Sequence, residues 1–532
     1  MKLSIALLTI IFTNAIITAN ASNILGLFLT YSPSHLIIHM SIIRALVEKG
    51  HNVTVITSMP LKDKNPQYRH IFLKNLDVSA KEITRLVNDM KDAPAHLKII
   101  KTFSATKTLF DRYSQFTKDP DFISFMKEDN QFDLMLHGYG FNEYQLGVAA
   151  HFKCPVVMSW VLQPFGYLNR LIGNPTHPEF VPFALMDPKP MDFSRRVIGF
   201  LANIVERIFS GVFGILIEQV YNENYPSDKY PTLTEMQNNI SLVLFNHHFS
   251  EGPVRPLVPG MVEIGGIQIK EKPDPLPDDV AKFLENSSKG AIFFSLGSNV
   301  KADHLDPNFI PTVYKTLSNL PYNVIWKFDS DQFPGNSSNI LFKKWLPQDD
   351  ILAHGNLKLF ITHAGKGSVT ESEYHQVPMV ALPVYGDQPT NADKIQAKGH
   401  GLALDIHSMT ENSFKEAVLE VMENDKYRNI VRQFSELYRD RPLTARQNTV
   451  YWIEYVIRHK GAPHMQSPLK RMNILQENSI DVIVFLSVVA YLVFKLIKVL
   501  ILVLILINGC PGYGPIPGAA YGCGLTILAI SE

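Results

Sequence analysis

Apolar segments of strand length alternate with helix-like segments in two separate series along the chain. The first series begins with a strand at 24–30, a helix at 34–49 and a strand at 53–57. This strand–helix–strand order predicts a parallel sheet with right-handed crossovers. Further strands of the first series are expected at 133–136 and 155–160.

A second series of the same kind follows a proline-rich, charged stretch. Its strands are expected at 291–297, 322–328, 357–362 and 377–383, and the helical segment 410–458 closes it. We therefore predict an α/β protein with two doubly wound, Rossmann-like domains, 22–270 and 281–460, joined by a linker at 271–280. Ligands of such domains bind outside the carboxyl ends of the strands, here in the cleft between the domains.

The amino-terminal segment has the features of a secretory signal. Residues 3–17 are apolar after Lys2, and the small-x-small pattern at 19–21 is typical of a cleavage site. Residues 1–21 are therefore predicted to be a signal peptide. An uncleaved membrane anchor is the alternative, and both place the chain in the secretory pathway.

The carboxyl-terminal region contains a second apolar segment. Residues 480–507 are long enough to span a bilayer, and Lys495 and Lys498 are expected to reach the cytosolic headgroups. Together with the signal peptide, this transmembrane segment predicts a single-pass type I protein of the endoplasmic reticulum membrane with a lumenal catalytic part. The Gly/Pro-rich tail 508–532 has no physical explanation.

Composition bounds the size and the partners of the protein. The chain has 532 residues, 46% of them apolar, and a formal net charge of zero. This length suffices for two or three domains. A neutral chain gives no reason to expect nucleic acid as a partner.

The segment FITHAGKGSVTE at 360–371 places a histidine and a glycine-rich turn between a strand and a helix. Free N–H groups at such a helix start attract phosphate, and Gly365 and Gly367 let the backbone approach a ligand closely. His363 and Ser368 can add donors, while Glu371 can accept hydrogen bonds from two ribose hydroxyls. The pattern predicts a nucleotide-diphosphate site, and an ordinary helix start with flexible glycines is the alternative.

Flanking segments add groups suited to a nucleotide sugar. Trp345 can stack on a flat base and Gln348 can read its edge. Asp387 and Gln388 follow downstream in YGDQPTN. Together with FSLGSN at 294–299, these segments resemble the nucleotide-sugar signature of the UDP-glycosyltransferase family, in its animal microsomal branch. The resemblance covers nearly the whole mature chain.

The resemblance implies a GT-B-like fold, with an acceptor-binding N-terminal domain and a UDP-sugar-binding C-terminal domain. It assigns Trp345 to uracil, Gln348 to the base or ribose, and Glu371 to the ribose hydroxyls. The residues implied for the diphosphate are Ser298, His363, Gly365, Gly367 and Ser368. Asp387 and Gln388 would bind sugar hydroxyls. The UDP-sugar is then a co-substrate, and neither a cofactor nor a metal is expected.

Two positions in the glycine-rich turn depart from the family pattern. Ala364 stands where the family usually has a glycine, and Lys366 is unusual at its position. We expect Ala364 to be tolerated. We expect Lys366 to point to solvent, and the alternative is that its charge lies near the phosphates.

A general base is needed to remove the proton of the acceptor, and histidine suits this role near neutral pH. His35 in YSPSH resembles the Ser-His of the family, in which the histidine is that base. The family pairs this histidine with a carboxylate. Here the corresponding position is taken by His137, Gly138 or Tyr139, and Glu143 is the nearby candidate for the missing partner.

These features favour an inverting transfer of a hexose, with glucose preferred because no basic residue flanks Asp387 and Gln388 in the sequence. The acceptor would be a small lipophilic hydroxyl compound bound between residues 103 and 160. The apolar segment 197–220 would line the acceptor site, rest on the membrane or form a core helix. The altered carboxylate position leaves a catalytically impaired UDP-sugar-binding membrane protein as the alternative, and a homo-oligomer stays open.

Overall fold

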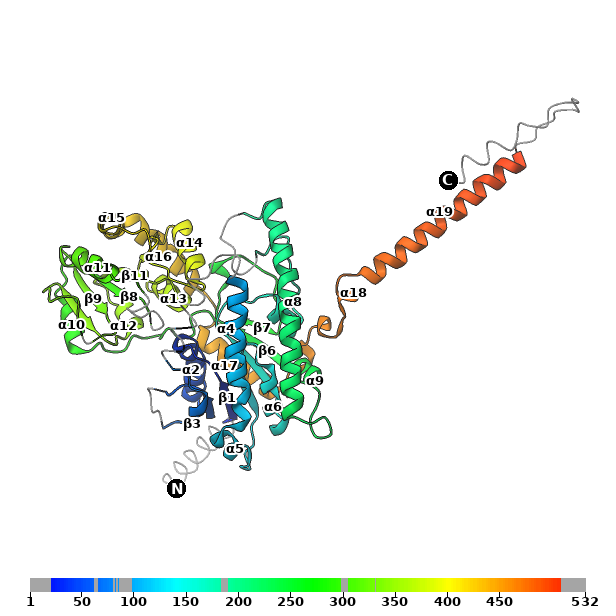
Figure 1. The fold of residues 1–532 in the computed structure, drawn as a ribbon, viewed down its shortest axis with the longest axis horizontal. Coiled ribbons are helices and arrows are strands. Elements are labelled where there is room, and N and C mark those ends of the chain that lie inside the picture. Colours follow the sequence, from blue (N-terminus) through cyan, green and yellow to red (C-terminus); the bar gives the residue numbers. More distant parts are fainter. Residues whose placement is uncertain are drawn as a thin grey trace, which may run out of the picture. The chain divides into compact units, whose positions relative to one another are not determined.

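The computed structural model describes residues 21–61, 66–79, 82, 85, 98–182, 190–297, 305–330 and 332–508. The chain divides into two compact units, Met1–Lys470 and Arg471–Glu532, which are described separately (Figure 1). Residues 1–20 of the predicted signal peptide, Ser298 and residues 509–532 of the tail lie outside the described residues.

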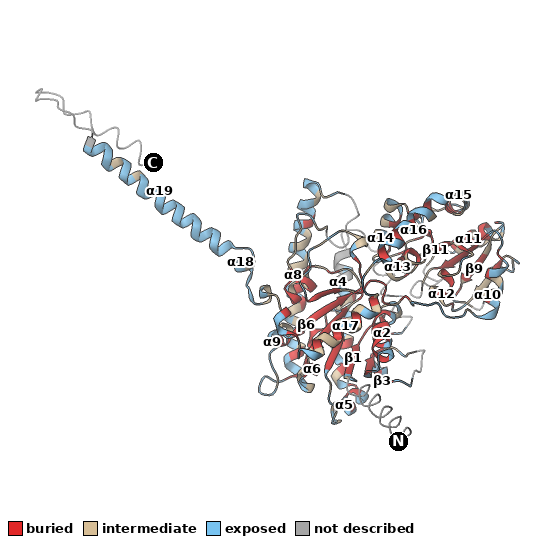
Figure 2. Cartoon of the chain, turned by 180° about the vertical axis from the view of Figure 1, so that it is seen from behind, coloured by how far each residue is buried: buried red, intermediate tan, exposed pale blue. Residues whose placement is uncertain are grey.

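The first sheet is built from seven strands in the order β3-β2-β1-β4-β5-β6-β7, and all neighbours are parallel. Most of its strand residues are buried on both faces (Figure 2), as continuous apolar runs in a parallel sheet require. The strands are β1 (Asn23–Phe28), β2 (Asn52–Thr57), β3 (Tyr68–Phe72), β4 (Leu134–Gly138), β5 (Val156–Trp160), β6 (Ile240–Phe245) and β7 (Met261–Glu263).

Helices cover both faces of the first sheet. One core includes residues from α4 to α9, and the other is dominated by α2 and receives residues from α17. These helices are α2 (Pro33–Glu48), α4 (Lys98–Tyr113), α5 (Pro120–Met126), α6 (Leu146–Phe152), α7 (Gly166–Ile172), α8 (Phe193–Asn224), α9 (Leu233–Asn238) and α17 (Ala445–Arg458). The expected second domain ran to residue 460, but α17 at its end packs on α2 and so joins the first domain.

The second sheet repeats this arrangement with six parallel strands in the order β10-β9-β8-β11-β12-β13. The strands are β8 (Ala291–Ser295), β9 (Asn323–Lys327), β10 (Ile340–Lys343), β11 (Leu357–Thr362), β12 (Met379–Ala381) and β13 (Gly401–Ala403). Its helices are α10 (Asp278–Glu285), α11 (Phe309–Ser318), α12 (Gln348–Leu352), α13 (Lys366–Tyr374), α14 (Gln388–Lys398), α15 (Glu411–Glu423) and α16 (Asp425–Arg439).

Each sheet has one point at which the winding of the chain reverses. In the first sheet this switch point lies between β1 and β4, and in the second it lies between β8 and β11. Doubly wound sheets bind their ligands in the crevice outside the strand ends at such a point. His35 follows β1 and His363 follows β11, so each of these two histidines stands at a switch point.

Helix α8 is long and apolar, but it is not a buried core helix. Only 17% of its most apolar window is buried, and Figure 2 shows exposed and half-buried residues along much of its length. Its largest exposed side chains are Phe193, Ile198, Phe200, Leu201, Val205, Ile208 and Ile215. Its length and composition also pass the criteria for a membrane-crossing helix.

The second unit contains α19 (Ile480–Asn508), preceded by α18 (Ile474–Glu477). The window Ile480–Ile507 has a mean hydropathy of 2.7 and none of it is buried. Its length exceeds the roughly 20 residues that cross the hydrocarbon core of a bilayer. This segment is therefore a candidate membrane span.

Candidate active site

The ring of His363 lies between Gly365, in the turn after β11, and Gly297, after β8. Ala364 adopts a left-handed φ of 60°, and Gly365 is the N-cap residue of α13. A Cβ added at Gly365 would lie 2.5 Å from His363 Nε2, and one added at Gly297 would lie 2.5 Å from its Cε1. Any larger residue at these two positions would displace the imidazole, so both glycines are needed to place the ring.

The start of α13 presents donors for an anion. Gly365 provides no side-chain cap, and the first intrahelical bond runs from Val369 N–H to the Gly365 carbonyl (3.0 Å). The N–H groups before Val369 therefore have no partner within the helix. Burial and the charge of Lys327 lower the pKa of His363 to about 4, so its ring is neutral at pH 7, and its buried Nδ1 has no partner among the described residues.

Gln348, Ser368 and Glu371 form one hydrogen-bonded group beside this helix start. The amide of Gln348 donates to Ser368 Oγ (3.1 Å) and to Glu371 Oε2 (2.7 Å). Burial and the nearby Asp349 raise the pKa of Glu371 to about 8. Trp345 precedes this group with 54% of its surface exposed, and Lys327 Nζ lies 5.6 Å from its ring centroid. An exposed indole suits stacking on a base, and a carboxyl group suits hydrogen bonds from a ribose.

Asp387 and Gln388 lie at the start of α14, close to the same turn. Asn391 donates both to Asp387 Oδ2 (2.7 Å) and to the Ala364 carbonyl (3.0 Å), and so ties α14 to the glycine-rich turn. Burial raises the pKa of Asp387, opposed by Asn391 and by Lys366. The amide oxygen of Gln388 accepts from the N–H groups of Val384 and Tyr385 (2.8 and 3.0 Å), so it holds its own loop in place.

Lys366 does not point to solvent, contrary to the prediction. Its ammonium group forms an ion pair with Glu251 and donates to Thr370 Oγ1 (2.7 Å), and the two side chains of the ion pair are only 16% and 9% exposed. Glu251 lies in a short helix after β6 of the first sheet, so the pair joins the two domains. The prediction failed because the partner is 115 residues away in sequence.

Gln268 is a further group at this site that the sequence did not reveal. It follows β7, and its Nε2 lies 3.9 Å from the position that a Cβ on Gly367 would occupy. Gln268 also lowers the pKa of Glu371, so the two side chains are neighbours. Its amide oxygen is buried without a hydrogen-bond partner among the described residues, which leaves it available to a ligand.

His35 lies in the first turn of α2, at the switch point of the first sheet. Its side chain is half-buried, and burial lowers the pKa of its imidazole to about 4. The ring is therefore neutral at pH 7 and able to accept a proton. Within the described part of the chain, no hydrogen bond or ion pair joins His35 to a carboxylate.

Glu143, the candidate partner, faces a different neighbour. Its Oε1 accepts a hydrogen bond from the Tyr167 hydroxyl (2.5 Å), and its Oε2 is buried without a partner among the described residues. Burial raises the pKa of Glu143 to about 7. The structure does not bring Glu143 to His35, so this pairing gains no support from the geometry.

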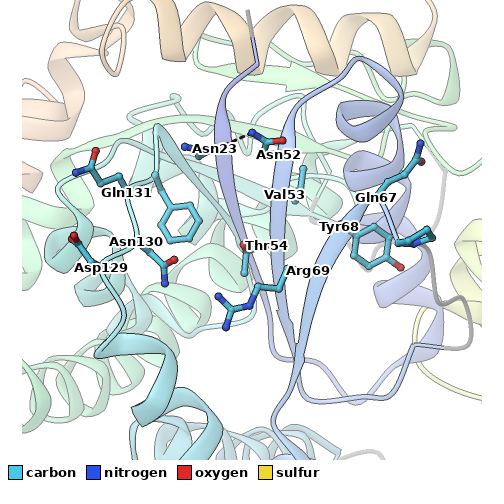
Figure 3. A pocket seen from close by; sticks show the side chains of 12 residues that line it. Asn23, Asn52, Val53, Thr54, Gln67, Tyr68, Arg69, Asp129, Asn130 and Gln131 are labelled. Atoms are coloured by element: carbon cyan, nitrogen blue, oxygen red, sulfur yellow. Dashed lines mark hydrogen bonds between the residues drawn. The ribbon is translucent and has the colours of Figure 1, made fainter. Parts of the chain in front are cut away.

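The pocket in Figure 3 lies at the amino-terminal ends of the strands of the first sheet, away from the carboxyl ends that His35 follows. It has a volume of about 530 Å³ and is lined by the first residues of three strands, Asn23, Asn52 and Tyr68, and by the loop that ends at Phe132. Asn52 donates to Asn23 across its rim (3.1 Å). None of the predicted site residues lines this pocket, so it is not the nucleotide site.

The described residues contain no group of three or more His, Cys, Asp or Glu side chains that could hold a metal ion. The expectation of a reaction without metal stays a prediction.

Comparisons with known proteins agree with this arrangement. The family described as UDP-glucoronosyl and UDP-glucosyl transferase matches residues 26–508. UDP-glycosyltransferase UGT5 of Dactylopius coccus is 32% identical over 494 residues, which cover 92% of each chain. UDP-glucuronosyltransferase 1A1 of Rattus norvegicus is 29% identical, with 87% of this chain and 88% of that protein covered.

Solved structures support the fold. A UDP-glucosyltransferase from Polygonum tinctorium aligns over 82% of this chain and 99% of its own, with 14% identity and a TM-score of 0.53. The calicheamicin glycosyltransferase CalG4 aligns with 16% identity and a TM-score of 0.52, covering 82% of this chain and 98% of its own. The two Rossmann-like domains match GT-B glycosyltransferases, which confirms the predicted fold class. The chain belongs to the UDP-glucoronosyl and UDP-glucosyl transferase family and is an enzyme that transfers a sugar from a UDP-sugar to an acceptor.

Proposed function

We propose that this protein transfers glucose from UDP-glucose to a hydroxyl group of small lipophilic acceptors, with inversion at the sugar carbon and with His35 as the general base. The observation that carries the proposal is the presence of a suitable group at each switch point. The second sheet supplies the donor half of the site, which consists of Trp345, Gln348, Glu371 and Asp387 around the turn at His363. The first sheet supplies the catalytic half around His35.

The two halves can act together in one displacement. The acceptor oxygen attacks C1 of the hexose from the face opposite the β-phosphate, and the bond between C1 and the phosphate oxygen breaks. UDP leaves with that electron pair, and the N–H groups at the start of α13 stabilise its charge. The acceptor proton passes to the neutral imidazole of His35.

Aromatic side chains near the carboxyl ends of β4 and β5 support a lipophilic acceptor. Phe141 and Tyr167 stack with centroids 5.6 Å apart, and Tyr139 meets Trp160 edge-on at 5.6 Å. Phe165 packs against Trp160 at 5.3 Å. Aromatic rings of this kind favour ring-containing molecules, and the Tyr167 hydroxyl has a polar contact with Glu143.

The charges beside Asp387 support a neutral hexose. Lys366 is the cation whose charge reaches Asp387, and it is already paired with Glu251. UDP-glucuronate is the competing donor, and Lys394 is the observation that favours it. Burial and Lys366 lower the pKa of Lys394 to about 8, so a sugar carboxylate that reached it would gain an ion pair.

Membrane attachment belongs to the same proposal. A span at 480–507 would make the enzyme a single-pass type I protein of the endoplasmic reticulum, with its catalytic part in the lumen. The mean hydropathy of 2.7 over Ile480–Ile507 supports the span.

The second candidate function is that of a catalytically impaired protein that only binds UDP-sugars. This candidate is favoured because no carboxylate in the described part of the chain forms a hydrogen bond or ion pair with His35. Membranes that carry the protein would be given UDP-glucose or UDP-glucuronate with a panel of phenols, and UDP release would be measured beside UDP-sugar binding. Acceptor-dependent release with UDP-glucose supports the proposal. Release only with UDP-glucuronate overturns the choice of donor, and binding without release from either donor favours the impaired protein.

A further inference from the structure

A second histidine lies in the catalytic half of the site, beside Gly138, which is one of the three positions at which the family resemblance implies a carboxylate. We propose that His39, held by Ser159 above Gly138, is a positioning residue that orients His35 in place of the carboxylate. This inference rests on the proposed function of His35 as the base.

Gly138 leaves no room for an acidic side chain. It ends β4 and pairs in register with Ser159 of β5. A Cβ added at Gly138 would lie 2.9 Å from a ring carbon of Phe28 and 3.2 Å from His39 Nε2. The space that an aspartate or glutamate at this position would need is therefore filled by the Phe28 ring and the His39 imidazole.

The His39 ring is fixed from two sides. Its Nδ1 lies 2.9 Å from Ser159 Oγ, and its plane stacks on Phe28 with a centroid distance of 4.8 Å and an interplanar angle of 2°. The side chain is buried. Of the two ring nitrogens, Nδ1 is thus engaged by Ser159, and Nε2 is the one beside Gly138.

His39 shares a face of α2 with His35, because the two residues are four positions apart in one helix. His35 and His137 are the titratable groups whose charges act on His39, and together with burial they lower its pKa to about 3. His137 on β4 has its own partner, since its Nε2 lies 3.2 Å from Gln145 Oε1. His39 is therefore neutral under all conditions in which the enzyme would work.

A neutral His39 can fix the tautomer of His35. When His39 donates its Nδ1–H to Ser159 Oγ, its Nε2 carries the lone pair that the proposed hydrogen bond from the His35 N–H would use. The other nitrogen of His35 is then unprotonated and faces the acceptor hydroxyl. A neutral ring stabilises the protonated form of His35 less than a carboxylate would, so His35 keeps a low pKa.

Two substitutions separate positioning from simple packing. Glutamine reproduces a polar atom near the Nε2 position of histidine, whereas asparagine reproduces one near Nδ1. We expect His39→Asn to keep the contact with Ser159 but to lower kcat about 10- to 100-fold, and His39→Gln to keep most of the activity. UDP affinity should be unchanged in both variants and shows that each is folded. Equal activities of the two variants would overturn the proposal.

A swap tests the same idea without requiring turnover. His39→Ala combined with Gly138→Asp removes the imidazole and introduces a carboxylate, with His39→Ala alone as the control. The imidazole of His35 would be titrated by NMR with labelled histidine. A carboxylate beside His35 should raise its pKa by more than one unit and move the acid limb of the pH–rate profile to higher pH. An unchanged His35 titration would contradict the proposed geometry. If the wild-type enzyme releases no UDP with any acceptor, the function fails, and this titration still decides the position of His39.

Discussion

The two switch points of this molecule have the same topology, but they differ in how many of the expected site residues contact one another. In the second sheet, the residues expected around the His363 turn contact one another: Gln348 bonds to Ser368 and Glu371, and Asn391 bonds to Asp387 and to the turn itself. In the first sheet, no carboxylate among the described residues bonds to His35, and two further histidines lie nearby. The expected donor residues thus contact one another, whereas in the catalytic half the His39 imidazole lies beside Gly138.

The largest expected effect concerns the ion pair that joins the two halves. Glu251→Gln leaves the buried cation of Lys366 without its partner, and we expect a loss of about 3 kcal/mol in the free energy of unfolding. Lys426→Met, which removes an exposed pair with Glu420, is the control and should leave stability unchanged. Chemical denaturation measures both. Equal effects would mean that the two domains do not depend on this pair.

The same pair has a definite pH dependence. Burial opposes the ionisation of Glu251, but Lys366 outweighs it and lowers the pKa from 4.5 to about 2. A carboxyl group whose pKa is lowered by folding stabilises the fold at any pH above its ordinary pKa. This stabilisation is lost as the pH falls from the ordinary pKa to the lowered pKa. The wild-type protein should therefore lose this contribution between about pH 4.5 and pH 2, and Glu251→Gln should lack it.

Glu371 tests the donor half directly. If its carboxylate accepts two ribose hydroxyls, Glu371→Ala should weaken UDP binding by about 1.5–3 kcal/mol, roughly 10- to 100-fold. Because the pKa of the wild-type group is raised to about 8, ionisation increases with pH, and UDP affinity should rise up to about tenfold between pH 7 and pH 9. Glu371→Gln should remove this rise. Calorimetry with UDP measures all three proteins, and a pH-independent wild type would sink the ribose assignment.

Trp345 should contribute a smaller part of the same binding. Its half-exposed indole offers a stacking surface, and Trp345→Ala should cost about 1–2 kcal/mol of UDP affinity, while Trp345→Phe keeps most of it. Trp326, in β9 of the second sheet, is buried and offers no such surface. An unchanged affinity of Trp345→Ala would show that uracil lies elsewhere.

The smallest effect is expected at Gln268. Its buried amide oxygen has no partner among the described residues, so a hydrogen bond from a ribose hydroxyl would stabilise the complex by about 1 kcal/mol. Gln268→Ala should therefore weaken the binding of UDP about fivefold and leave 2′-deoxy-UDP unaffected. Equal losses with both nucleotides would assign Gln268 to the phosphates or to packing.

Much of the fold could be predicted because its signals are local. Long apolar runs such as β1 and β11, each followed by a helix, mark strands of a parallel sheet whatever lies elsewhere. Strands such as β3, with its polar Arg69 and His70, and β13, with only three residues, carry too little of this signal. The packing of α17 on α2 depends on contacts between segments far apart in sequence.

The donor half could be predicted for the same reason, since most of its members lie within one strand–turn–helix unit and its flanks. The contacts that could not be predicted join distant segments. Glu251 meets Lys366 across 115 residues, and Ser159 meets His39 across 120. Nothing in the local pattern of either segment indicates the other.

The most direct test of the account compares His35→Ala with the wild type in two measurements on the same preparation, UDP binding by calorimetry and acceptor-dependent UDP release. We expect the variant to bind UDP as tightly as the wild type and to lose UDP release by about 10²- to 10⁴-fold. Release that persists in the variant would remove His35 as the base. Loss of UDP binding would show that the two halves of the site are not separate.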